Sequence, residues 1–150
     1  MLVITEPDRR IREQLKPTRI AIITGLIFFF AGLVKFAFHH WELHAFRSFG
    51  LPWPSAMEIV AGVVETIGGA LLVARRGVVP VTIMLAVTML VAIVASGIGH
   101  GDVIPSLTLA PALLLAVVYL LAVAMPPSRV AETYRSARFR RHATRGRWTR

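Results

Sequence analysis

Four long segments of the chain consist almost entirely of apolar residues, and shorter polar segments separate them. These segments cover residues 20–38, 56–74, 78–98 and 105–125, and each has 19 to 21 residues. A helix of this length is about 30 Å long, which is the thickness of the hydrocarbon core of a bilayer. The pattern predicts an all-α polytopic membrane protein whose residues 20–125 form a bundle of four transmembrane helices.

The second segment differs from the others because it contains two carboxylates, Glu58 and Glu65. A buried helix of a soluble protein is the alternative interpretation for this segment alone. Its apolar neighbours favour a membrane span, because backbone polar groups in lipid must be satisfied within a helix. The composition agrees, since 55% of the residues are hydrophobic and 17% are charged, against about 45–50% and 25% in soluble domains.

The basic residues are distributed unevenly between the two ends of the predicted bundle. If all four segments span, 15 of the 17 Lys and Arg residues lie on one side, Lys35 lies within a span and Arg47 lies on the other side. Cytoplasmic loops are enriched in Lys and Arg, so both termini are predicted to be cytoplasmic. Residues 1–19 then form a basic N-terminus, and residues 126–150 form an Arg-rich tail. Both face the anionic inner leaflet, which favours lipid over nucleic acid as the partner of these charges.

Charged residues and glycines share one face of the second segment. Glu58, Gly62, Glu65 and Gly69 are spaced by four, three and four residues, which places them on one helical stripe. Glycine allows close helix packing in membranes, so we expect this stripe to face the bundle and to meet the first segment. The helix-packing residues predicted from this stripe are Gly62 and Gly69.

The predicted intramembrane polar cluster consists of Lys35, Glu58 and Glu65. Lys35 and Glu58 lie at similar depth and Glu65 lies about 10 Å deeper, so Lys35 can extend outward, pair with Glu58 or reach Glu65. Two interpretations stay open. The cluster either only holds two helices together, or it forms a polar pocket that binds a ligand head group or passes a proton.

The remaining polar residues give weaker indications. The histidines on the outward side are weak candidates for metal ligands, and because no established ligand motif is present we expect no metal; they are His39, His40, His44 and His100. If the first helix continued past Phe38, His40 and His44 would share one face. Thr88, Ser96 and His100 are spaced by multiples of four. They either line a polar interior or, for the hydroxyls, bond to their own helix backbone.

Three short motifs give the chain a family resemblance. The first segment reads Gly25-x-x-Phe28-x-x-Ala31-Gly32-x-x-Lys35, Gly50-Leu51-Pro52 follows, and the second segment reads Ala61-Gly62-x-x-Glu65-x-x-Gly68-Gly69. Over residues 19–125 this order resembles the DoxX family of small four-helix membrane proteins of the bacterial cytoplasmic membrane. The resemblance implies that Lys35 and Glu65 are recurrent polar positions and that Gly32, Gly68 and Gly69 serve packing. Glu58 is particular to this chain.

The resemblance also suggests a role connected with redox chemistry. The family takes its name from a quinone-linked oxidoreductase subunit, and some relatives are described as partners of a superoxide dismutase and a sulfurtransferase. The chain has no cysteine, which excludes thiolate metal sites and thiol chemistry. The four predicted spans also contain no histidine. We therefore expect no covalently bound cofactor and no electron-transfer centre in this chain, with quinone as the implied ligand.

Three functions stay open at this point. The first is a non-catalytic accessory or anchoring subunit of a quinone-linked or thiol-stress-linked complex, whose partner is a soluble oxidoreductase or another membrane subunit. The second is a binding or transport protein for a small apolar molecule that uses the Lys35, Glu58 and Glu65 pocket. The third is a structural membrane scaffold. A homo-oligomer is compatible with all three, and a stand-alone enzyme is the least favoured interpretation.

Overall fold

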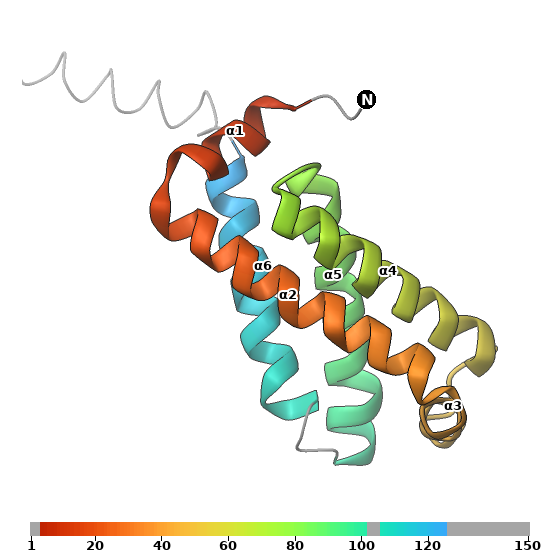
Figure 1. Ribbon diagram of the computed structural model, residues 1–150. Coiled ribbons are helices and arrows are strands. Elements are labelled where there is room, and N and C mark those ends of the chain that lie inside the picture. Colours follow the sequence, from red (N-terminus) through yellow and green to blue (C-terminus); the bar gives the residue numbers. More distant parts are fainter. Residues whose placement is uncertain (1–3, 102–105, 126–150) are drawn as a thin grey trace, which may run out of the picture.

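The computed structural model describes residues 4–101 and 106–125, and the regular structure of these residues is entirely helical (Figure 1). Helices α2, α4, α5 and α6 pack into a bundle, with α1 at one end and α3 at the other. A π-helix, η1, continues α5 directly. The elements are α1 (Glu6–Glu13), α2 (Leu15–Ala37), α3 (His39–Ser48), α4 (Pro54–Ala74), α5 (Val78–Ala92), η1 (Ile93–Ile98) and α6 (Leu109–Ala124). The predicted Arg-rich tail lies outside the described residues.

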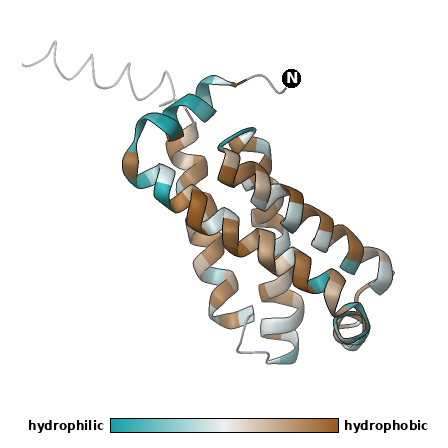
Figure 2. Ribbon diagram, viewed as in Figure 1, coloured by the Kyte–Doolittle hydropathy of each residue, from teal (hydrophilic) through white to brown (hydrophobic). Residues whose placement is uncertain are grey.

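Three of these helical segments are long and apolar enough to cross a membrane: α2, α4, and α5 together with η1. Helix α6 is equally apolar but has 16 residues. Their outward faces are apolar (Figure 2), with side chains such as Phe30 and Leu115 exposed. Polar residues gather instead on α1 and α3 at the two ends. A wide apolar surface of this kind indicates a membrane protein, as the hydropathy pattern predicts.

The starts of two helices differ from the predicted spans by four or five residues, and a proline lies in the first turn of each. Helix α2 begins at Leu15 rather than at residue 20. Helix α6 begins at Leu109, whereas the predicted start, residue 105, lies outside the described residues. Pro17 and Pro111 then fall in the first turns of their helices. The backbone N–H groups of a first turn have no partner within the helix, so proline is tolerated there.

Glycines allow α2 and α4 to pack with their backbones in contact. A Cβ atom added to Gly69 would lie 2.6 Å from the Gly25 carbonyl oxygen, and one added to Gly25 would lie 2.7 Å from the Gly69 oxygen. A Cβ atom on Gly32 would lie 2.7 Å from the Gly62 oxygen. These distances are too short for any side chain. The close approach fixes the register of the two helices that carry Lys35 and Glu65.

Helix α1 caps the turn between α4 and α5. The Asp8 carboxylate, which is fully buried, accepts a hydrogen bond of 2.9 Å from the backbone N–H of Val78, the first residue of α5. One turn later, the Arg12 guanidinium donates to the carbonyl oxygens of Ala74 (2.7 Å) and Arg75 (3.3 Å) at the end of α4. A carboxylate at a helix N-terminus and a cation at a C-terminus both complement the helix dipole. We call this arrangement the α1 clamp.

The α1 clamp is expected to contribute to stability in a pH-dependent way. Burial alone would raise the pKa of the Asp8 carboxyl, but hydrogen bonds from the backbone of Val78, Thr5 and Gly77 outweigh burial and lower the pKa below its ordinary value of 3.8. A group with a lowered folded-state pKa stabilises the fold fully above its unfolded pKa. That stabilisation is lost as the pH falls through the folded value.

We therefore expect Asp8→Ala to lower the free energy of unfolding by about 1–3 kcal/mol at neutral pH, because buried backbone N–H groups lose their acceptor. The measurement is unfolding of the detergent-solubilised protein, and Glu13→Ala, an exposed acid on the same helix, is the control. The gap between wild type and Asp8→Ala should close as the pH falls below 3.8. A gap that persists unchanged in acid would contradict the proposed hydrogen-bonding role.

Candidate functional site

A cavity of about 420 Å³ lies among α2, α3, α4, α5 and α6. Its walls are mainly apolar and include Phe28 of α2, Phe46 of α3, Val60 of α4, Val87 of α5 and Leu113 of α6. Small residues such as Ala92 of α5 and Ala95 of η1 also line the cavity and leave space in it. Because the walls come from five helices, the cavity exists only in the assembled bundle.

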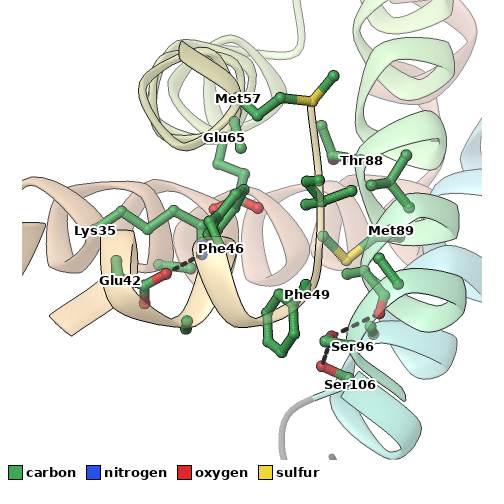
Figure 3. Close-up of a pocket in the computed structure, with 18 of the residues that line it drawn as sticks. Lys35, Glu42, Phe46, Phe49, Met57, Glu65, Thr88, Met89, Ser96 and Ser106 are labelled. Atoms are coloured by element: carbon green, nitrogen blue, oxygen red, sulfur yellow. Dashed lines mark hydrogen bonds and ion pairs between the residues drawn. The ribbon is translucent and has the colours of Figure 1, made fainter. Parts of the chain in front are cut away.

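Charged side chains stand at one side of this cavity, and hydroxyl groups stand at the other (Figure 3). The Lys35 ammonium lies between two carboxylates, with its Nζ 3.5 Å from Glu65 Oε2 and 3.7 Å from Glu42 Oε2. The side chain of Glu65 is 5% exposed, and those of Lys35 and Glu42 are 19% and 17% exposed. We call Lys35, Glu42 and Glu65 the charged triad.

The charged triad retains hydrogen-bonding capacity. Charge-assisted hydrogen bonds between an ammonium and a carboxylate are about 2.7–2.9 Å long. The two distances from Lys35 Nζ are longer, so Lys35 attracts both carboxylates electrostatically but makes no close hydrogen bond with either. Glu65 Oε2 is buried and has no hydrogen-bond partner among the described residues. An unsatisfied buried acceptor is costly. A donor placed in the cavity beside Glu65 would remove that cost.

The structure separates Glu58 from the cluster in which the sequence analysis placed it. Lys35 pairs with Glu65, whereas the fully buried Glu58 carboxylate lies 2.8 Å from Nδ1 of His39. The chain bends at Phe38, between α2 and α3, with backbone angles of −115° and 36°. This bend brings His39 to α4. Neither His39 nor Glu58 is among the residues that line the cavity.

Glu42 is the member of the charged triad that the sequence analysis did not identify. It follows Lys35 by seven residues, and in a continuous helix two full turns would separate the two side chains by about 10 Å. The bend at Phe38 turns α3 across the end of the bundle (Figure 1), which brings Glu42 to within 3.7 Å of Lys35 Nζ. The only signal in the sequence was an acidic residue near the end of a span.

The histidine candidates do not form a metal site in the described part of the chain. No three His, Cys, Asp or Glu side chains there are close enough to hold a metal ion. The possibility that α2 continues through the histidines is wrong, because α2 ends at Ala37. His40 and His44 are exposed on the separate helix α3. Nδ1 of His100 lies 2.8 Å from the carbonyl oxygen of Ala95.

The candidate hydroxyl groups of α5 and η1 both line the cavity and bond to their own helix backbone, so the two predicted alternatives hold together. Thr88 and Ser96 line the cavity, and each also donates to its own helix, to the carbonyl oxygens of Leu85 (2.8 Å) and Ala92 (2.7 Å). The Ser96 hydroxyl further contacts that of Ser106. His100 is not among the residues that line the cavity, and its ring lies against that of Phe49, with the ring centroids 5.2 Å apart.

Comparison with known proteins identifies the family. A family model described as DoxX matches residues 18–97, which contain most of α2, all of α3, α4 and α5, and most of η1. All three members of the charged triad lie within the match. No curated protein and no solved structure matches the chain. The resemblance drawn from the glycine, lysine and glutamate motifs is confirmed, and the chain belongs to the DoxX family of membrane proteins.

Proposed function

We propose that the protein crosses the bacterial cytoplasmic membrane four times, with both termini in the cytoplasm. Helix α1, the α4–α5 turn and the end of α6 lie at one end of the bundle (Figure 1). Seven basic residues of the described chain belong to that end, against Arg47 on α3: Arg9, Arg10, Arg12, Lys16, Arg19, Arg75 and Arg76. This asymmetry supports the orientation. Helix α6 is about 24 Å long, and local thinning of the bilayer accommodates a short span at modest cost.

Within this topology, we propose that the protein binds a small lipophilic molecule in the cavity, with the polar head of that molecule at the charged triad. The cavity itself is the observation that carries the proposal. Its volume of about 420 Å³ falls in the range of small-molecule sites, which are mostly apolar with a few polar groups that fix orientation.

The chemistry of the lining defines how such a ligand would lie. The apolar walls would take up the hydrocarbon part, and Lys35 and Glu65 would offer a donor and an acceptor to the head group. A quinone meets these requirements in part, since Lys35 can donate to a quinone oxygen and aromatic walls can pack on its ring. The protein would then hold and orient the quinone, and the quinone would supply the redox chemistry. Binding is thus compatible with an accessory role in a redox complex.

Filling the cavity should abolish binding without harming the fold. We expect that 4-butylbenzyl alcohol raises the melting temperature of the wild-type protein in a nonionic detergent and that Ala92→Phe removes this rise. At 100 times the dissociation constant, a ligand adds about 2.7 kcal/mol to stability. The matched control is Leu90→Phe, because Leu90 lies on the same helix, does not line the cavity and is 50% exposed.

Two outcomes would contradict this proposal. If Ala92→Phe folds normally and responds to the alcohol as strongly as Leu90→Phe does, the ligand binds elsewhere and the cavity is not the site. If the wild-type protein itself shows no response to lipophilic probes, the cavity has only a structural origin.

A further inference from the structure

We propose that the cavity selects lipophilic molecules with a cationic amine head over neutral or anionic molecules of the same shape. The inference rests on the proposed function, namely that the cavity binds a lipophile, and it adds the chemical class of the head group. Two independent features support it: the charge balance of the triad and the aromatic lining beside it.

The charge balance of the cavity is negative. The charged residues that line it are one cation, Lys35, and two anions, Glu42 and Glu65, so the ionised site carries a net charge of −1. The neighbouring pair, His39 and Glu58, lies outside the lining, and the Glu58 carboxylate contacts Nδ1 of His39 at 2.8 Å. A cationic head would neutralise the site. Charge interactions are stronger in a partly desolvated site than in water, so this balance bears directly on selectivity.

The buried Glu65 carboxylate gives the cation a defined position. Glu65 is 4% exposed, lines the cavity and holds Oε2 without a hydrogen-bond partner in the described chain. Lys35 Nζ stays 3.5 Å from this atom. An ammonium has three N–H donors and no acceptor, and it can therefore donate to Glu65 and to Glu42 together. An alcohol offers one donor, and a carboxylate offers none and adds a third negative charge.

Aromatic rings stand where the substituent next to the head group would lie. Trp41, Phe46 and Phe49, all from α3 or its C-terminal end, line the cavity, and Figure 3 shows Phe46 and Phe49 between the charged triad and the serines. The face of an aromatic ring attracts an ammonium. The same rings pack against a neutral ligand without that added attraction, so they also favour the cation.

The test compares three probes that differ only in the head group: 4-butylbenzylamine, 4-butylbenzyl alcohol and 4-butylbenzoate. Binding to the full-length protein in a nonionic detergent is measured by calorimetric titration at pH 7, where the amine is protonated and the benzoate is ionised. We expect the amine to bind about tenfold more tightly than the alcohol, because a charge-assisted hydrogen bond is about twice as strong as a neutral one. The benzoate should bind most weakly.

Two variants connect this preference with the triad. Glu42→Gln keeps the shape of the side chain and leaves the ion pair of Lys35 with Glu65 in place, so the amine should lose its advantage while the alcohol still binds. Glu13→Gln removes the same charge from the exposed surface of α1 at the opposite end, and it should keep the preference. This control removes any general effect of net charge on the partition of the amine into the micelle.

The possible outcomes separate the inference from the proposed function. Equal binding of the three probes, all lost in Ala92→Phe, overturns the selectivity and leaves the cavity as a binding site. The tightest binding by the benzoate, or an amine preference that persists in Glu42→Gln, also overturns the selectivity. Absence of binding by every probe contradicts both proposals. Because the wild-type protein alone yields the ranking, the test does not depend on whether a variant folds.

Discussion

Lys35→Met should destabilise the protein by about 3–5 kcal/mol, because it leaves a buried carboxylate without its counter-charge. The side chain of Glu65 is 5% exposed, and Lys35 is its ion-pair partner at 3.5 Å. Methionine keeps the length of the lysine stem, so the change removes little packing. The measurement is unfolding of the detergent-solubilised protein by titration with a denaturing detergent, followed by circular dichroism.

Two controls make this expectation specific. Lys16→Met removes an exposed lysine near the other end of the same helix and should change stability little. The double variant Lys35→Met with Glu65→Leu removes both charges, and it should recover much of the loss, since a buried ion pair can be replaced by apolar residues at little net cost. If Lys35→Met is as stable as Lys16→Met, the ion pair contributes no stability and Glu65 is neutral or hydrated in the folded protein.

Gly69→Ala should be the second severe change, although it adds a single methyl group. The new Cβ would lie 2.6 Å from the Gly25 carbonyl oxygen and would also meet the backbone of Phe29. Backbone cannot move aside as a side chain can, so α2 and α4 must separate. Overpacking costs about 1–3 kcal/mol and occasionally more, and we expect the upper part of that range in the same unfolding measurement.

The adjacent glycine provides a matched control. For a Cβ atom on Gly68 the three nearest atoms would all belong to the side chain of Leu85, the nearest at 3.2 Å, and that leucine can shift by a few tenths of an ångström. Gly68→Ala should therefore cost much less than Gly69→Ala. Because Lys35 and Glu65 are carried on the two helices that separate, Gly69→Ala should also weaken ligand binding. Equal effects of the two substitutions would show that α2 and α4 do not pack through Gly69.

The main features of the bundle could be predicted from the sequence because lipid allows few alternatives. An apolar segment in a bilayer must be helical, and this constraint alone indicates α2, α4 and α5. The inward orientation of the stripe of Glu65 and glycines could also be predicted, since a carboxylate on a membrane helix turns toward the protein interior. The pairing of Lys35 with Glu65 did not follow from depth, because the sequence places Lys35 level with Glu58 and Glu65 about 10 Å deeper, which left both partners open.

The parts that could not be predicted depend on local backbone geometry. Phe38, where α2 gives way to α3, is neither glycine nor proline, so nothing in the sequence marked the bend that brings Glu42 to Lys35 and His39 to Glu58. The π-helix η1 also has no sequence signature. The cavity requires five helices to leave a space between them. Packing of that kind is a property of the assembled bundle and not of any segment.

The α1 clamp has a consequence for how the chain reaches its topology in the membrane. Asp8 and Arg12 are made early in synthesis, yet their partners Ala74, Arg75 and Val78 emerge more than sixty residues later. The clamp therefore closes only after α2, α4 and the start of α5 exist, and only if the α4–α5 turn lies on the same side as α1. A chain whose spans inserted with the wrong orientation would leave Asp8 and Arg12 without these partners. The clamp thus forms late in synthesis, and it stabilises only a chain in which α1 and the α4–α5 turn lie on the same side of the membrane.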